Sequence, residues 1–203
     1  MKFCKPFPPF QANSLEKIGA IILAYQPQGP LREKDQLNLL PPFFSLETCL
    51  KNFFQISFKQ IVLVLGYDYH HILNRFSMFP KSVKIVIHRK PEKGLGSALL
   101  VGLQALHHEL NGVVISKGDT VVEAKILEHL LQIFEENVNN PNSKKKVIVP
   151  LYSRKHGFPW VVSTQLKKSM MELKSETTLD VFLKKHKKEI LTVALEKIFG
   201  EKS

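Results

Sequence analysis

The sequence predicts an α/β fold of three layers, α/β/α, in which helices cover both faces of a mainly parallel sheet. Short apolar runs alternate along the chain with helical segments of roughly ten or more residues, which is the pattern of repeated βαβ units. The length of 203 residues suits one such domain. A composition of 44% apolar and 23% charged residues is typical of soluble globular proteins and excludes disordered and fibrous chains.

The first half of the chain begins with an isoleucine-rich run at 18–24, which has the length and composition of a fully buried strand. A long loop with four prolines at 25–42 precedes a helix at 45–54. Long loops in compact domains are usually functional or mobile. The next three expected elements are a strand, a helix and a strand, at 61–65, 68–78 and 83–87.

The second half continues the alternation after a loop at 88–96. Leucines at helical spacing, Leu99 to Leu110, predict a helix at 97–110 with one apolar face. The remaining expected elements are a strand at 112–116, a helix at 123–136, strands at 147–150 and 160–162, a helix at 178–188 and a strand at 190–195. We predict one domain at 18–203, preceded by an N-terminal extension at 1–17.

The charge is +11, from 29 basic and 18 acidic side chains, and most of the excess follows residue 143. Such a balance indicates a polyanionic partner, a phosphate-bearing ligand or a solvated lysine-rich face. Cys4 and Cys49 are too few for a disulfide framework or a four-cysteine zinc site. No segment reaches the roughly 18 apolar residues of a membrane span, and we expect a cytoplasmic protein without a signal peptide.

In an open parallel sheet, ligands bind beyond the carboxyl ends of the strands, and Asp119 directly follows the expected strand at 112–116. A carboxylate beside Gly118 suits a hard cation such as Mg²⁺ that bridges substrate phosphates. The alternative is an N-cap for the following helix.

A glycine turn, Gly94 to Ser97, precedes another helix and offers backbone N–H groups to an anion or a base edge. Its structural alternative is a tight turn with Ser97 as N-cap. In the loop after the first strand, Gly29, Arg32 and Lys34 suit phosphate binding or a solvated loop, without a dinucleotide-binding or P-loop signature.

The histidines and the cysteine in the helix at 45–54 do not indicate a metal site or a catalytic nucleophile. The histidine groups at 70–71, 107–108 and 156 lack metal-ligand spacing, and we interpret them as surface residues. Cys49 lies in an apolar helix, and no Gly-x-Ser-x-Gly elbow occurs, so we expect no hydrolase nucleophile.

Several segments in order resemble the MobA-like nucleotidyltransferases, over residues 18–195. The first strand Gly19–Ala24 and the Gly94–Ser97 turn look like the family's phosphate-loop strand and nucleotide-contacting turn, and Gly118-Asp119 looks like its metal-binding motif. The other similar segments are Leu39–Pro41, Ile61–Gly66, Val147–Tyr152 and Gly157–Pro159.

The resemblance implies a Rossmann-like domain that transfers a nucleotidyl group from CTP or GTP to a phosphorylated small-molecule acceptor, as in molybdenum cofactor maturation. It implies Mg²⁺ at Asp119 and triphosphate contacts from Arg32 and Lys34. The residues that would hold the nucleotide are Ala24, Gly29, Gly94, Gly96 and Ser97. From the sequence itself we expect neither a membrane nor a nucleic-acid partner, and the oligomeric state stays open.

The chain also departs from the family. Tyr25 stands where a glycine is expected, Phe158 replaces a histidine, and no second aspartate follows the last strand. A relative that binds nucleotide without catalysis therefore stays open as an alternative. A nucleic-acid-binding protein is the third alternative, based on the basic clusters at 144–146 (three lysines) and 184–188 (four lysines and His186), but these clusters lack interleaved aromatic residues.

Overall fold

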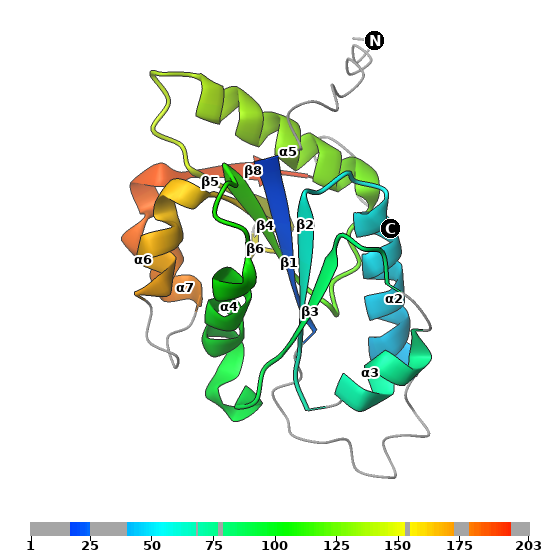
Figure 1. The fold of residues 1–203 in the computed structure, drawn as a ribbon. Coiled ribbons are helices and arrows are strands. Elements are labelled where there is room, and N and C mark those ends of the chain that lie inside the picture. The colour runs from blue at the N-terminus through cyan, green and yellow to red at the C-terminus, as the bar shows by residue number, and fades with distance from the viewer. Residues whose placement is uncertain are drawn as a thin grey trace, which may run out of the picture.

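The computed structural model describes residues 17–24, 40–67, 69–76, 79–152, 155–172 and 179–195. Within them, the chain forms a sheet of eight strands in the order β3-β2-β1-β4-β7-β5-β6, with β8 paired to β5 (Figure 1). The strands are β1 (Ile18–Ala24), β2 (Gln60–Leu65), β3 (Val83–Ile87), β4 (Gly112–Lys117), β5 (Val147–Tyr152), β6 (Lys155–His156), β7 (Trp160–Ser163) and β8 (Ile190–Ala194).

The first four strands are parallel, as the alternation with helices predicts. Leu23 of β1 pairs with Val64 of β2 on one side and with Lys117 of β4 on the other. The carboxyl ends of β1, β2 and β4 are therefore level. This alignment gathers the loops that follow these strands at one edge of the sheet.

The second half of the sheet contains antiparallel pairs. β7 runs antiparallel to β4 and to β5, and β6 runs antiparallel to β5. Short connections between β5, β6 and β7 explain this, because a parallel pair needs a crossover of about a dozen residues or more. β8 returns parallel to β5 after the last helix. The sheet is thus mainly but not wholly parallel.

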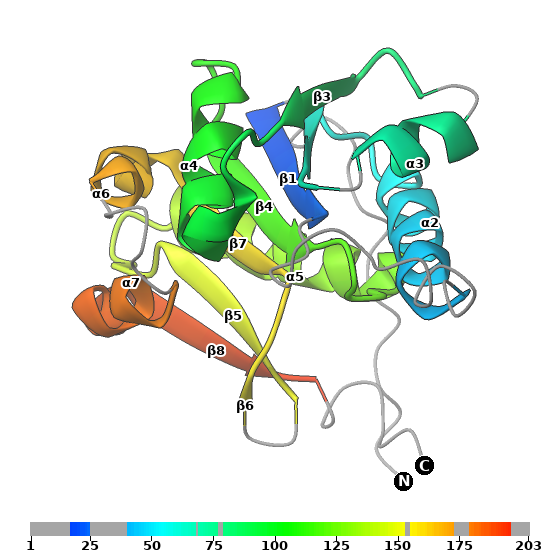
Figure 2. The same cartoon turned by 90° about the horizontal axis from the view of Figure 1, so that it is seen from below.

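Helices cover both faces of the sheet. Figure 2 shows α2 (Leu40–Phe54) and α3 (Tyr69–Arg75) on one side and α4 (Gly94–Ala105), α6 (Lys167–Met171) and α7 (Leu179–Lys185) on the other. The helix α5 (Ala124–Asn139) packs its buried leucines and Phe134 into the same apolar cluster as α2. The expected three-layer arrangement is confirmed. No helix among the described residues is long and apolar enough to cross a membrane.

Several helix bounds differ from the expected ones. α4 begins at Gly94, not at residue 97, and it ends at Ala105 because Leu106 is extended, with φ −71° and ψ 145°. Leu106 and Leu110 nevertheless stay buried. α2 begins at Leu40, with prolines in its first turn, where a missing N–H costs no hydrogen bond.

Other helices also differ from the expected ones. α3 and α7 are shorter than expected, and α6 is an element that the periodicity did not predict. Short 3-10 turns, which local patterns rarely reveal, complete the connections at 91–93, 164–166 and 187–189.

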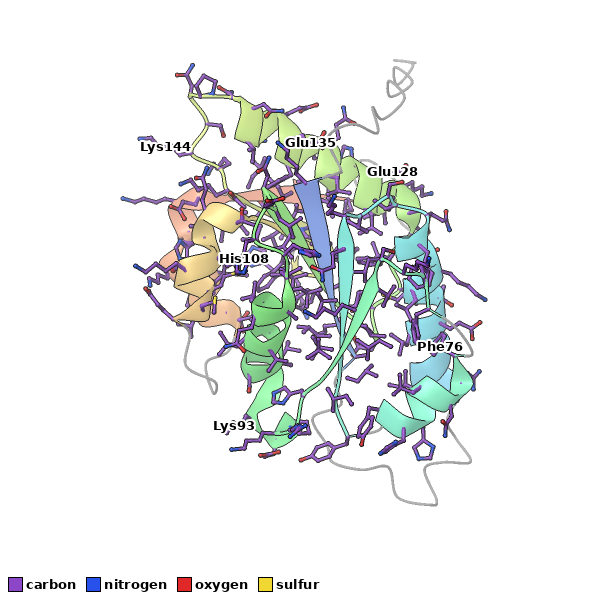
Figure 3. The ribbon with its side chains drawn as sticks, in the orientation of Figure 1. Phe76, Lys93, His108, Glu128, Glu135 and Lys144 are labelled. Carbon is purple, nitrogen blue, oxygen red and sulfur yellow. The ribbon has the colours of Figure 1, made fainter. Side chains whose placement is uncertain are left out.

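The lysine-rich C-terminal segment is hydrogen-bonded to the end of the loop between α5 and β5. The Nζ of Lys145 donates hydrogen bonds to the carbonyl oxygens of Lys188 and Ile190, at 3.1 and 2.9 Å. Figure 3 places Lys144 and Lys93 at opposite ends of the molecule. Lys93 lies where α4 begins, so Lys144 lies away from the glycine turn.

Candidate functional site at the carboxyl edge of the sheet

The end of β4 lies tightly against the end of β1. The backbone N–H of Gly118 donates to the carbonyl oxygen of Leu23 at 3.0 Å. A Cβ on Gly118 would meet both the Cα of Ala24 and the Cδ1 of Leu46 at 3.0 Å. A side chain at this position would therefore push the two strand ends apart. The glycine keeps Ala24 and Asp119, two of the predicted site residues, at the same point of the edge.

The carboxylate of Asp119 is exposed at this edge. Its Oδ1 accepts a hydrogen bond from the hydroxyl of Thr120 at 3.2 Å. The N-cap of α5 is Glu123, so Asp119 does not cap that helix. The carboxylate is therefore exposed at the edge and takes no part in capping the helix.

The donor set at Asp119 fits a magnesium-type ion. Within the described ranges, no group of three or more His, Cys, Asp or Glu side chains is arranged to hold a metal. Mg²⁺ usually takes one or two carboxylates and completes its octahedron with water and substrate phosphates. One exposed carboxylate would meet that requirement together with substrate phosphates, whereas a zinc site would need more protein ligands.

Cys49 of α2 lies beneath the same edge and is fully buried. Its Sγ donates to the carbonyl oxygen of Lys117 at 3.8 Å. Burial, together with the nearby charge of Asp119, raises the pKa of the Cys49 thiol to about 12. The thiol therefore stays protonated and packs as a core side chain, and it is no nucleophile at neutral pH.

The glycine turn forms the second part of the site. A 3-10 turn at 91–93 leads to Gly94, whose φ of +88° and ψ of −177° belong to a region occupied essentially by glycine alone. α4 starts there, with Lys93 as N-cap and no capping side chain. The N–H of Gly94 donates to the carbonyl oxygen of Pro91. The following N–H groups of the first turn lack i−4 carbonyl partners, as at any helix start, and such groups suit an anion.

Ser97 lies inside the first turn of α4 and is buried, so the alternative of Ser97 as N-cap is wrong. Its hydroxyl oxygen lies 2.9 Å from the Nε2 of His88. The Nδ1 of His88 accepts the backbone N–H of Lys90 at 3.0 Å. Because Nδ1 acts as acceptor, the neutral ring carries its hydrogen on Nε2 and donates it to Ser97.

His88 is a site residue that the sequence analysis missed. It is almost completely buried, and desolvation lowers the pKa of its imidazole. Its position in the sequence could have indicated a site residue, because it directly follows β3 and lies in the loop that leads to the glycine turn. An isolated histidine at such a position is indistinguishable, by spacing alone, from the exposed His107 and His108.

A third glycine brings the two parts of the site to one edge. A Cβ on Gly102 would lie 2.7 Å from the Cγ2 of Ile21, so its absence lets α4 pack closely over β1. α4 contacts both β1 and β2, and its N-terminus therefore lies over the carboxyl ends of these strands. Gly94, Gly96 and Ser97 thus share the edge with Ala24 and Asp119. Gly29, Arg32 and Lys34 lie outside the described residues.

The sequence from residue 45 to residue 190 matches the model of the MobA-like NTP transferase domain. This chain belongs to the MobA-like NTP transferase family. The match includes the glycine turn and Gly118-Asp119, and the sheet with helices on both faces is the Rossmann-like fold expected from it. Comparison with curated protein sequences finds no significant match.

Several solved structures share this fold, among them two that are named as nucleotidyl or CTP transferases. Rv0371c of Mycobacterium tuberculosis, in complex with manganese, has a TM-score of 0.66 at 18% identity, covering 88% of this chain and 87% of its own. A nucleotidyl transferase of Methanothermobacter has a TM-score of 0.66 at 15% identity, with coverage of 88% and 87%. The inositol-1-phosphate CTP transferase of T. maritima has a TM-score of 0.55 at 12% identity, with coverage of 87% and 84%.

Proposed function

We propose that the protein catalyses Mg²⁺-dependent transfer of a nucleotidyl group from CTP or GTP to a phosphorylated small molecule. The observation that carries the proposal is the shared edge, where the Gly118-Asp119 pair and the glycine turn of α4 lie together in a chain of this family. We further propose a single domain at 18–203 that acts in the cytoplasm, with molybdenum cofactor maturation as the candidate process.

In this reaction a phosphate oxygen of the acceptor attacks the α-phosphorus of the triphosphate. A new P–O bond forms, and the bond to the bridging oxygen breaks and releases pyrophosphate with its electron pair. Such a reaction needs positioning and charge stabilisation more than covalent chemistry from the protein. Asp119 would hold the magnesium ion, which neutralises phosphate charge.

Other residues would bind the triphosphate and the rest of the nucleotide. Arg32 and Lys34 would bind the triphosphate. The residues that would hold the nucleotide are Ala24, Gly29, Gly94, Gly96 and Ser97. Supporting features are the start of α4, which no side chain caps and whose N–H groups after Gly94 suit anions or base edges, and the hydrogen bond that fixes Ser97.

Structural neighbours support the nucleotide and the acceptor class. One of them is a CTP transferase that acts on inositol 1-phosphate, and another carries manganese in its structure. Both names agree with a triphosphate, a phosphorylated acceptor and a divalent ion for this chain. The acceptor of this chain is to be identified by the assay described next.

The test measures pyrophosphate release by the full chain from CTP or GTP with phosphorylated acceptors, in the presence of Mg²⁺ or Mn²⁺. A thermal-shift panel of all four triphosphates, with and without metal, reports binding separately. We expect Asp119→Ala to lose the metal-dependent activity, and Gly96→Val to lose the nucleotide-induced shift. Unchanged activity in Asp119→Ala would remove Asp119 from the reaction. Binding without turnover would favour the non-catalytic relative.

A further inference from the structure

Lys117 is the last residue of β4 and precedes Asp119 by two positions. Its side chain is half-buried, and its Nζ lies 5.6 Å from the centroid of the Phe158 ring. The Phe158 ring also stacks on the ring of Trp160, with 4.9 Å between their centroids and 9° between their planes. An ammonium above an aromatic face is attracted by the negative face of the ring.

The backbone around Phe158 is held by three hydrogen bonds. The Tyr152 hydroxyl donates to the carbonyl oxygen of Phe158 at 3.0 Å, and the indole N–H of Trp160 donates to that of Gly157 at 2.8 Å. The N–H of Gly157 donates to the carbonyl oxygen of Pro150 at 2.9 Å. The aromatic support beneath the ammonium is therefore a fixed part of the fold.

Tyr152 also restricts which residue can occupy position 157. A Cβ on Gly157 would lie 2.3 Å from the Cδ2 of the Tyr152 ring. Burial raises the pKa of the Tyr152 hydroxyl to about 12, so it stays a donor at neutral pH. The packing and the hydrogen bond together set the orientation of the segment that carries Phe158.

The charge of Lys117 is not neutralised by a carboxylate in the part of the chain that the structure describes. The ion pairs found there use Glu47, Glu123 and Glu189. A half-buried ammonium with an aromatic partner keeps its charge available for an anion. Lys117 lies at the carboxyl edge of the sheet, two residues before Asp119, and its ammonium has an aromatic partner.

The order of strands separates two halves of this edge. α4 and its glycine turn cover β1 and β2 on one side of β4, whereas β7 lies on the other side. Phe158 precedes β7, and Trp160 pairs with Ile115 of β4. Because its ammonium lies over Phe158, Lys117 reaches toward the half that does not carry the glycine turn.

We propose that Lys117, supported by Phe158, binds the phosphate monoester of the acceptor beside the nucleotide. This inference rests on the proposed transfer reaction and names the residue that selects its phosphorylated substrate. Lysine acts as a point charge with three donors, so it suits a phosphate that must bring one of its oxygens to the α-phosphorus. Lys117 takes part in no covalent step.

The experiment uses the full chain, saturated with Mg²⁺ and a non-hydrolysable CTP or GTP analogue, so that the nucleotide site is filled. Glycerol 3-phosphate serves as the phosphate monoester probe and glycerol as its uncharged counterpart, with binding measured by calorimetry. Lys117→Met keeps the apolar stem and removes the charge. We expect its affinity for glycerol 3-phosphate to fall by about tenfold or more, because a charge-assisted hydrogen bond is lost.

Two further variants sharpen the result. Phe158→Leu keeps Lys117 but removes its aromatic support, and we expect an intermediate loss of probe affinity. Lys81→Met is the matched control, because Lys81 is exposed in the turn before β3, at the amino end of the sheet. We expect it to stay within about twofold of the wild type, since an exposed charge at that distance is screened.

Each outcome of the titrations either supports or overturns the role of Lys117. Loss of probe affinity in Lys117→Met, with unchanged affinity for the nucleotide analogue, supports the inference. Equal weakening of both ligands would assign Lys117 to the nucleotide and overturn it, as would unchanged probe binding or no probe binding by the wild type. If the wild type binds no nucleotide analogue, the proposed transfer reaction fails, and the same probe titration on the nucleotide-free chain still tests Lys117.

Discussion

The Nε2 of His88 and the hydroxyl oxygen of Ser97 lie 2.9 Å apart, and both side chains are buried. The pair joins the end of β3 to the first turn of α4 across the 3-10 turn and Gly94. Because His88 donates to Ser97, the serine hydroxyl keeps its own hydrogen for another acceptor. The backbone of the glycine turn is thereby bridged by a side-chain hydrogen bond at the place where a nucleotide would bind.

Replacing His88 with leucine should weaken both the fold and nucleotide binding. The variant leaves the Ser97 hydroxyl and the Lys90 N–H without their partner, which costs about 1–3 kcal/mol of unfolding free energy when such groups are buried. We expect a smaller nucleotide-induced thermal shift as well. Chemical denaturation and thermal shift with CTP or GTP check both effects.

The matched control is His108→Leu. His108 is exposed in the turn before β4 and is marked in Figure 3. A surface substitution of this kind typically changes stability by about 0.5 kcal/mol or less. Equal losses in His88→Leu and His108→Leu would mean that the His88–Ser97 hydrogen bond contributes nothing specific.

Stability should fall as the pH is lowered below about 6.5, the ordinary pKa of histidine. Burial lowers the pKa of His88 in the folded chain, with Glu92 opposing that effect and Lys93 adding to it. Burial also lowers the pKa of His129, against the effect of Glu136. The unfolded chain therefore binds these protons first, and the free energy of unfolding decreases from about pH 6.5 downward.

Urea denaturation at several pH values between neutrality and mild acid measures this dependence. One histidine contributes at most about 1.4 kcal/mol per pH unit. His88→Gln, which cannot titrate, should show a shallower decline than the wild type. An identical decline in the variant would exclude His88 as a source of the acid sensitivity.

Gly94→Ala should destabilise the turn through its backbone alone. A Cβ at Gly94 would meet no atom within 4 Å, but φ is +88° with ψ at −177°. Holding a side chain in that conformation costs about 1–3 kcal/mol. We expect reduced nucleotide binding, measured by thermal shift, because the start of α4 must change its path.

Gly102→Ala provides the contrast. Its Cβ would lie 2.7 Å from Ile21, so it disturbs packing between α4 and β1 and not the turn. Overpacking of this kind costs about 1–3 kcal/mol. A wild-type nucleotide shift in Gly94→Ala would show that the turn does not contact the ligand.

Ser169→Ala should loosen the attachment of α6 to the end of α7. The carboxylate of Glu189 accepts from Nδ1 of His186 at 2.6 Å, and Nε2 of the same ring shares a hydrogen bond of 2.8 Å with the Ser169 hydroxyl. Loss of one such hydrogen bond costs about 1 kcal/mol of unfolding free energy. Denaturant midpoints measure it, with the exposed Ser57→Ala as control. A loss no greater than that of the control would contradict this role for Ser169.

Much of the fold follows from local patterns in the sequence. The apolar runs at 18–24, 61–65 and 83–87 predicted three strands within a residue of their observed bounds. Helix bounds were less accurate, because Gly94 and the prolines after Leu40 normally mark turns and here lie inside helices. Of the candidate residues, Asp119 and the glycine turn could be named from position after strands, and their roles stay predictions.

The sequence by itself determined the alternating α/β order, the buried strands and the motifs at their carboxyl ends, because burial and turn formation depend on neighbouring residues. Only the tertiary structure decided that β7 lies antiparallel between β4 and β5. It alone paired His88 with Ser97 and placed Lys117 over Phe158. Periodicity specifies which face of an element is apolar, but the partner of a side chain depends on how distant elements cross.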